Sequence, residues 1–314
     1  MKKKIISLVT AACMVATMLV GCGDTKAIEN LEKMVFTYVT APLNVPSIVE
    51  KEKEIFGGIF EDMDIDVEYA ELTSGADQTQ ALASGDVQVL YAVGASSVIL
   101  AAANDADIKV LNMYSRSPKA FCMYAKDETI SSPEDLRGKK IAGPAGTNLH
   151  ELLVSYLATA DMTIEDVDYV SMSIPEAKIA LDGERIDVAL VAGATAYQAG
   201  QQGYHMVADG EGLIDAIIAV AVTNDFYNKY PDVIQKLQQA QDEIVRFMME
   251  NEKEALQMVA EELDLEVAAV EEMYQLYDFS TEITEEDKKG FQRTADFMFE
   301  SGMIEKKLDV NKLF

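Results

Sequence analysis

The chain has 314 residues, of which 49% are hydrophobic, so it is long enough for a large core or for two lobes. Its 54 acidic residues against 26 basic ones give a formal charge of −28 at pH 7. This acidity argues against nucleic-acid binding, which requires a basic surface.

The first residues have the pattern of an export signal. Three lysines precede an apolar stretch, Ile5 to Val20, of about sixteen residues, which is short for a bilayer span of roughly twenty. The sequence Leu19-Val20-Gly21-Cys22 then resembles a bacterial lipobox. We predict a lipoprotein signal peptide at 1–21, lipid attachment (with palmitate) at Cys22, and a polar tether at 22–33. An ordinary cleaved signal or a short anchor is the alternative.

The mature chain predicted in this way would keep one unmodified cysteine, Cys122. An internal disulfide would then be impossible, although an extracytoplasmic compartment would permit one. Because Cys122 lies in an apolar run, we expect it to be a buried small hydrophobic residue rather than a reactive thiol.

Apolar runs typical of buried strands alternate with helical patterns through the first part of the chain. This alternation predicts a mostly parallel sheet. The expected strands are 35–40, 65–69, 87–93 and 108–114, and the expected helices are 45–56, 77–83 and 95–103.

A second series begins near residue 120. The expected strands are 120–125, 139–142, 167–172 and 186–192, and the expected helices are 149–160 and 175–181. We expect the chain to return to the first lobe near residues 215–222. From Phe226 onward it should be largely helical, because apolar residues recur at helical spacing from Val233 to Met248.

A weak internal repeat relates the two series. Residues 87–96 match residues 186–195 at an offset of 99 positions without gaps, and both segments contain an apolar run followed by Gly-Ala and a hydroxyl residue. Two copies at this long period do not make a solenoid. The repeat instead predicts two α/β lobes, with lobe 1 at 34–118 plus 215–314 and lobe 2 at 119–214.

The turns after four predicted strands carry hydroxyl, amide and small residues. In open α/β sheets, ligands lie beyond the carboxyl ends of the strands. Such residues could hold a small polar group through neutral hydrogen bonds, although each is also an ordinary way to begin a helix. The predicted ligand-binding residues are Thr40, Asn44, Ala95, Ser96, Gly146, Thr147, Asn148, Ala194 and Thr195.

Catalytic and metal-binding patterns are missing from the sequence. It has two histidines, no cluster at zinc-ligand spacing, no Gly-x-Ser-x-Gly elbow and no Walker-type loop. We therefore expect no enzyme activity, no cofactor and no metal. The basic residues nearest to the predicted turns are Arg116 and Lys119, so an anionic ligand would have to be held by helix N-termini and hydroxyls. A neutral or zwitterionic solute is equally compatible.

Several segments resemble one family of transport proteins. Ala81–Val89 (ALASGDVQV) is similar to an "AL-x-SGD-x-D-V" element, and 45–56, 132–142 and 302–310 also look typical. The family is the nitrate/sulfonate/taurine class of ABC-transporter solute-binding proteins, which includes the thiamine-precursor-binding relatives. One departure is Gln88, where the family usually has an aspartate, whereas Asp187 keeps it in the second copy.

The resemblance implies a type II periplasmic-binding-protein fold, in which two α/β lobes close on a ligand by a hinge motion. It also implies a small-molecule ligand (sulfonate-, nitrate- or taurine-like, or a small heterocyclic or zwitterionic compound), an ABC permease and its ATPase. We expect a monomer, lipid-anchored at the extracytoplasmic face of the cell membrane. The alternatives are an enzyme on the same fold, for example in pyrimidine-precursor chemistry, and a surface sensor with a degenerate cleft.

Overall fold

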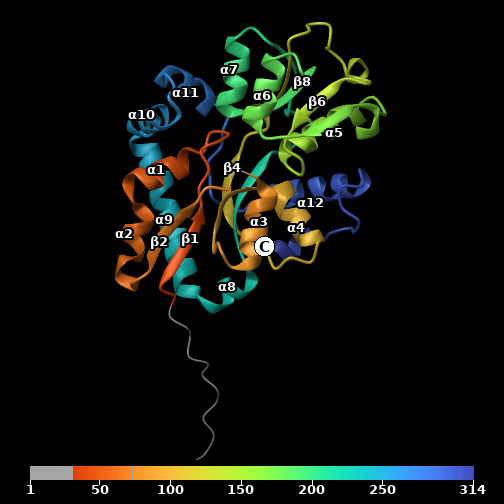
Figure 1. The fold of residues 1–314 in the computed structure, drawn as a ribbon. Helices are drawn as coiled ribbons and strands as arrows, with labels where there is room; N and C mark the ends of the chain where they lie inside the picture. The colour runs from red at the N-terminus through yellow and green to blue at the C-terminus, as the bar shows by residue number, and fades with distance from the viewer. Residues whose placement is uncertain (1–30, 73) are drawn as a thin grey trace, which may run out of the picture. The chain divides into compact units, whose positions relative to one another are not determined.

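The computed structural model describes residues 31–72 and 74–314 (Figure 1). The predicted signal peptide, Cys22 and all but the last residues of the predicted tether lie outside the described residues. Within the described part, no helix is both long enough and apolar enough to cross a bilayer.

The first sheet contains strands from both ends of the chain. Strands β1 and β2 pair in parallel, and β10 lies antiparallel between β3 and β4. A bridge between Phe36 and Val89 joins the two groups, which gives the order β2-β1-β3-β10-β4. The bounds are β1 Lys33–Thr37, β2 Asp66–Ala70, β3 Leu90–Gly94, β4 Lys109–Arg116 and β10 Ile217–Val222.

The second sheet repeats this topology. Its order is β7-β6-β8-β5-β9, with β5 antiparallel to β8 and β9, so β5 takes the place that β10 takes in the first sheet. The bounds are β5 Phe121–Ala125, β6 Lys140–Gly143, β7 Asp168–Ser171, β8 Val188–Ala192 and β9 His205–Asp209. The two sheets, with the helices that cover them, form the first and second lobes.

The repeat extends to side chains. Gln88 Oε1 accepts a hydrogen bond from the Val35 amide of β1 at 2.8 Å. Asp187 Oδ2 accepts one from the Lys140 amide of β6 at 2.7 Å. The glutamine that departs from the family pattern therefore makes the same kind of contact as the aspartate in the other lobe.

Helices follow the strands and cover both sheets. Those of the first part of the chain are α1 Val45–Lys53, α2 Ile55–Phe60, α3 Gly75–Ser84 and α4 Ala95–Ala103. The second lobe has α5 Asn148–Ala158, α6 Ile174–Asp182 and α7 Gly193–Gln201. The short 3-10 helices are η1 Glu61–Met63, η2 Pro118–Ala120, η3 Pro133–Leu136, η4 Ile164–Asp166 and η5 Val310–Leu313.

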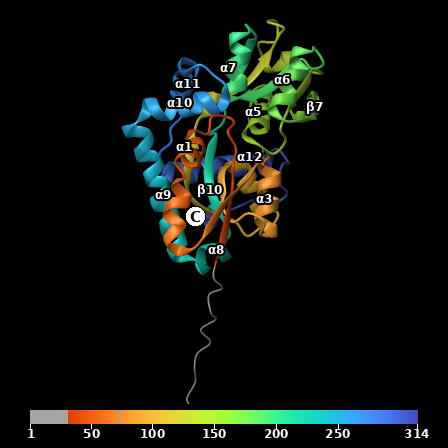
Figure 2. The same cartoon turned by 60° about the vertical axis from the view of Figure 1, so that its left-hand side comes forward.

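The last part of the chain is helical, as predicted. Its helices are α8 Asn224–Lys229, α9 Pro231–Glu250, α10 Glu252–Leu263, α11 Val267–Tyr274 and α12 Glu285–Glu300. The apolar stripe from Val233 to Met248 is buried in α9, which packs on α1 and α2 (Figure 2). Helix α12 packs on α4 and β10 of the first lobe, and α11 packs on α7 of the second.

Three expectations from the sequence need correction. The helix expected at 45–56 is two helices, because Glu54 has φ 51° and turns the chain; the Phe56 amide then donates to the Glu50 carboxylate at 3.1 Å. The first strand ends at Thr37 rather than Thr40. Strand β9 was not expected, because it lies at the edge of its sheet and has no continuous apolar run.

Candidate functional site

Each predicted turn lies at the carboxyl end of a strand. Ala95 and Ser96 begin α4 directly after β3, and Ala194 and Thr195 lie in the first turn of α7, directly after β8. Gly146 and Thr147 connect β6 to α5, which begins at Asn148. Thr40 and Asn44 belong to the loop from β1 to α1. The turns after β1 and β3 therefore come from the first lobe, and the other two come from the second.

The turn after β1 contacts the turn after β8. The Ala194 amide donates to the Pro42 carbonyl at 3.3 Å. The approach is so close that a Cβ atom at Gly193 would lie 1.7 Å from the same oxygen, and Gly193 has φ +53°. A residue without a side chain is therefore required where these two turns meet.

The turn after β3 contacts the turn after β6. Ser96 Oγ lies 2.8 Å from Asn148 Oδ1, and Ser97 Oγ donates to the Gly146 carbonyl at 3.3 Å. Ser96 is fully buried and Asn148 is 3% exposed. The four turns therefore form two pairs, and each pair joins the two lobes. We call the region of these contacts the lobe junction.

Two predicted residues hold their own turns. The Asn44 side chain is 2% exposed and donates to the carbonyls of Val39 and Ala41 at 2.8 and 3.0 Å. Thr147 Oγ1 donates to the Pro144 carbonyl at 2.9 Å. Each of these two side-chain donors is therefore engaged within its own lobe. Thr40 and Thr195, in contrast, are half-buried at the junction.

Among the side chains of the four turns, one buried polar atom has no hydrogen-bond partner in the described residues. It is Asn148 Nδ2, which is buried together with the rest of its side chain. An unpaired buried donor is unfavourable by about 1–3 kcal/mol, and most buried polar groups in proteins are paired. An acceptor atom of a ligand at this point would satisfy it.

The histidine of this region supports a turn. His150 Nδ1 accepts from the Gly146 amide at 3.2 Å, and its ring stacks on Tyr169 with 4.8 Å between the ring centroids. Burial lowers the pKa of His150, which favours the neutral imidazole that this acceptor role requires. The contact orders the Gly146 turn from within the second lobe.

Glu151 and Thr294 also belong to the junction, and sequence reasoning did not select them. Glu151, 4% exposed, accepts a hydrogen bond from Thr294 Oγ1 of α12 at 2.9 Å, and its Oε2 lies 2.8 Å from Ser96 Oγ. Burial raises the pKa of Glu151 to about 7, against the opposing effect of the two hydroxyls and with the help of Asp215. The one signal in the sequence was a carboxylate within the otherwise apolar face of α5.

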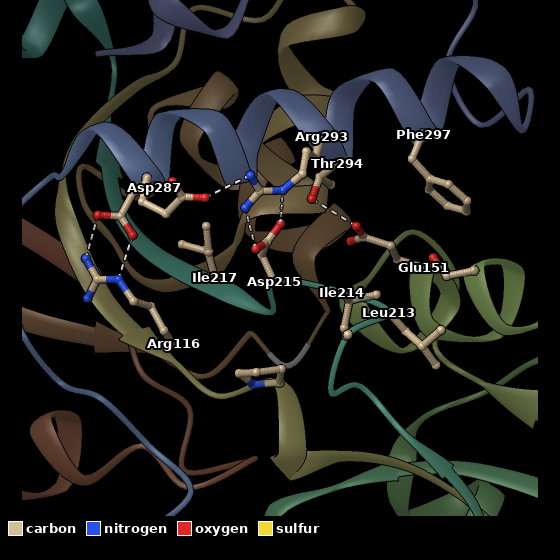
Figure 3. Close-up of a pocket in the computed structure, with 14 residues that line it drawn as sticks. Arg116, Glu151, Leu213, Ile214, Asp215, Ile217, Asp287, Arg293, Thr294 and Phe297 are labelled. Atoms are coloured by element: carbon tan, nitrogen blue, oxygen red, sulfur yellow. Dashed lines mark hydrogen bonds and ion pairs between the residues drawn. The ribbon is translucent and has the colours of Figure 1, made fainter.

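A cavity of about 600 Å³ lies beside Glu151, between α12, α5 and the segments that cross from one lobe to the other (Figure 3). Arg116 makes a bidentate contact with Asp287 at 2.6 and 2.7 Å. Arg293 makes one with Asp215 at 3.1 and 2.8 Å and also donates to Glu286. Both guanidinium groups are therefore matched by carboxylates.

A smaller cavity of about 260 Å³ adjoins the turn after β8. Its wall includes Gly193 and Tyr197 of α7 together with Tyr124, Met273 and further apolar residues. Cys122 also lines it; the thiol is buried, as predicted, and burial raises its pKa to about 12. Lys119, Asp209 and Glu272 also line it, so the cavity combines an apolar and aromatic surface with three charged side chains.

Other basic and metal-binding groups are not available at the turns. Lys119 pairs with Glu211 at 2.8 Å, and Arg116 is bound to Asp287. In the described ranges, no group of three or more His, Cys, Asp or Glu side chains is placed to hold a metal ion. The chemistry that the four turns offer is hydrogen bonding by amides and hydroxyls.

Known proteins with similar sequences are binding proteins. A Bacillus subtilis (strain 168) protein named for the binding of aliphatic sulfonates is 26% identical over 315 residues, which is 99% of this chain and 93% of that protein. The taurine-binding periplasmic protein of Escherichia coli K12 is 31% identical over 173 residues, 54% of this chain and 53% of that protein.

A solved structure shows the same fold. The alkanesulfonate-binding protein of Xanthomonas axonopodis pv. citri, solved bound to MOPS, superposes with a TM-score of 0.82 at 19% identity, over 90% of this chain and 97% of that one. The chain therefore has the type II periplasmic-binding-protein fold expected from its sequence.

The family profile described as "NMT1/THI5 like" matches residues 45–255, which is more than half of the chain. On this match, and in agreement with the sulfonate- and taurine-binding relatives, the protein belongs to the NMT1/THI5-like family.

Proposed function

We propose that this protein is the solute-binding component of an ABC importer and that it captures a small sulfonate between its two lobes. The observation that carries the proposal is the buried, unpartnered Nδ2 of Asn148, where the turn after β6 contacts the turn after β3. Sulfonate-binding relatives support the same ligand class.

Neutral donors suit a sulfonate headgroup. Its single charge is spread over three oxygen atoms, each of which accepts hydrogen bonds. Helices α4, α5 and α7 all begin at the junction, and their N-termini favour negative charge. Asn148 adds a side-chain donor, whereas Arg116 and Lys119 are paired elsewhere. The cavity beside Gly193, whose wall includes Tyr124, Tyr197 and Met273, would accept the rest of the molecule.

Capture would proceed by closure of two lobes around a hinge. We assign residues 34–118 and 215–314 to lobe 1 and 119–214 to lobe 2, so that both crossovers lie beside the 600 Å³ cavity. A permease and its ATPase would receive the solute. We further propose a monomer held at the extracytoplasmic face of the membrane through a lipid on Cys22, without catalytic activity.

The ligand class is tested by isothermal titration calorimetry of the chain from Gly23 with matched pairs of compounds. Taurine is compared with β-alanine, and ethanesulfonate with propionate, so that only the acidic group differs. We expect the sulfonates to bind with the larger affinity, with no turnover detected by mass spectrometry. Equal affinity for both members of each pair would contradict the sulfonate assignment.

Asn148→Asp tests the donor. The carboxylate would face the bound anion, and like charges across an interface cost several kcal/mol, so we expect affinity to fall at least tenfold. Asn104→Asp is the control, because Asn104 lies exposed at the end of α4 and donates to Leu100 O. A thermal melt checks that both variants fold. Unchanged affinity in Asn148→Asp would remove this residue from the site.

A further inference from the structure

Glu151 links three helices across the lobe junction. It extends from α5 of the second lobe to Ser96 of α4 and Thr294 of α12, which both belong to the first lobe. Figure 3 shows the contact with Thr294. Each carboxyl oxygen has one hydroxyl partner, Oε2 with Ser96 at 2.8 Å and Oε1 with Thr294 at 2.9 Å. If the lobes separate, this side chain loses both partners and meets water.

The hydrogens around Ser96 limit the protonation state of Glu151. Ser96 Oγ lies 2.8 Å from Asn148 Oδ1 and 2.8 Å from Glu151 Oε2, yet a hydroxyl has one hydrogen to donate. When Ser96 donates to Asn148, Glu151 Oε2 can remain at hydrogen-bond distance only by donating a hydrogen itself. A carboxylic acid at Glu151 satisfies all three oxygens.

The charges around Glu151 favour the same state. Arg293 on α12 is engaged by Asp215 and Glu286, and Arg116 at the end of β4 is engaged by Asp287. On α5 itself, His150 contacts Tyr169 and the Gly146 amide. Helix α4 faces Glu151 with Ser96. A buried carboxylate without a cation is unfavourable, and Asp215 adds to the cost.

We propose that Glu151 enters the lobe junction as a neutral carboxylic acid, so that capture of the solute by lobe closure takes up one proton from water. The inference rests on the proposed function, because it requires the lobes to open and close on a ligand. The proton binds at Glu151 Oε2, which then donates a hydrogen bond to Ser96 Oγ.

The direction of the pH effect follows from the two states. In the open state an exposed carboxyl has its ordinary pKa of 4.5, and in the closed state burial raises the pKa of Glu151 to about 7. The closed state therefore binds more protons between these values, so affinity rises as pH falls. The apparent Kd should increase by up to roughly tenfold per pH unit between about pH 5 and 7, and level off above 7.

The test is calorimetry of taurine binding from pH 5.0 to 8.5 with wild type, Glu151→Gln and Glu50→Gln. Glutamine at 151 mimics the neutral acid and can donate to Ser96, so its affinity should be constant with pH. Glu50 is a matched control: burial also raises its pKa to about 7, but it bonds Tyr69 and Phe56 within the first lobe. Glu50→Gln should keep the wild-type slope.

The outcomes separate this inference from the proposed function. If the apparent Kd of the wild type for taurine does not change with pH, as expected if Asn148 turned its nitrogen toward Ser96, the inference is wrong. It is also wrong if the Kd of Glu151→Gln keeps the pH dependence of the wild type. If neither taurine nor ethanesulfonate binds, the sulfonate assignment fails. The pH series is then repeated with β-alanine and propionate, because capture of either compound also requires closure of the lobes. A pH dependence of the affinity that is the same in wild type and Glu151→Gln would refute a neutral Glu151.

Discussion

Gly193 sets how closely the two lobes can approach. Its φ of +53° disfavours a side chain, and the Pro42 carbonyl occupies the space where a Cβ atom would lie. Both effects are local properties of one residue, but the second acts across the lobe junction. A methyl group at this position would hold the turn after β1 away from the turn after β8.

Gly193→Ala should therefore weaken solute binding. We expect the apparent Kd for taurine to rise at least tenfold, because the closed junction can no longer form. Gly203→Ala is the matched control: φ is +76° and no atom lies within 4 Å of an added Cβ. Both variants share the strain of a left-handed alanine, roughly 1–2 kcal/mol. Equal losses of affinity in the two variants would show that the contact with Pro42 is irrelevant.

The sequence indicated the positions of the junction residues better than their roles. Gly-Ala-hydroxyl turns after buried strands are visible as a pattern, and the structure brings all four turns together in pairs. The Asn44 side chain donates to two carbonyls of its own loop, and no sequence pattern predicts the positions of those carbonyls. Glu151 depends on Thr294, which lies 143 positions away along the chain.

At the scale of elements, the break between α1 and α2 shows how tertiary contacts override a helical pattern. Glu54 adopts a left-handed conformation, φ 51° and ψ 38°, although its side chain is exposed. The turn allows Phe56 and Phe60 to be fully buried, and the Glu50 carboxylate accepts from the Phe56 amide near the start of α2. The apolar periodicity of the sequence continues across this break, so it predicted one helix.

Glu54→Gly should stabilise the protein. Glycine removes the left-handed strain of roughly 1–2 kcal/mol but adds freedom to the unfolded chain, so we expect a net gain of roughly 0.5–1 kcal/mol in the free energy of unfolding. Glu243→Gly, at an exposed position inside α9, should instead lose about 1 kcal/mol. Urea denaturation measures both. A loss in Glu54→Gly as large as that in Glu243→Gly would contradict the strain argument.

At the scale of the whole chain, the internal repeat explains why the fold was predictable. Two sheets with the same strand order each receive one antiparallel strand, β10 or β5, and continuous apolar runs mark the buried strands in both. Edge strand β9 and the packing of α12 on α4 were not predictable, because neither leaves a strong local pattern. The junction between the lobes contains residues from distant parts of the chain, so its polar contacts form only in the folded protein.

In the proposed function, the solute is captured between the turns that join the two lobes. Hydrogen–deuterium exchange with and without saturating taurine tests it most directly, because protection reports where a ligand and closure act on the backbone. We predict new protection in peptides that cover 40–44, 94–97, 145–148 and 193–195. Protection confined to the cavity between α12 and α5, or no change despite binding by calorimetry, would contradict the account.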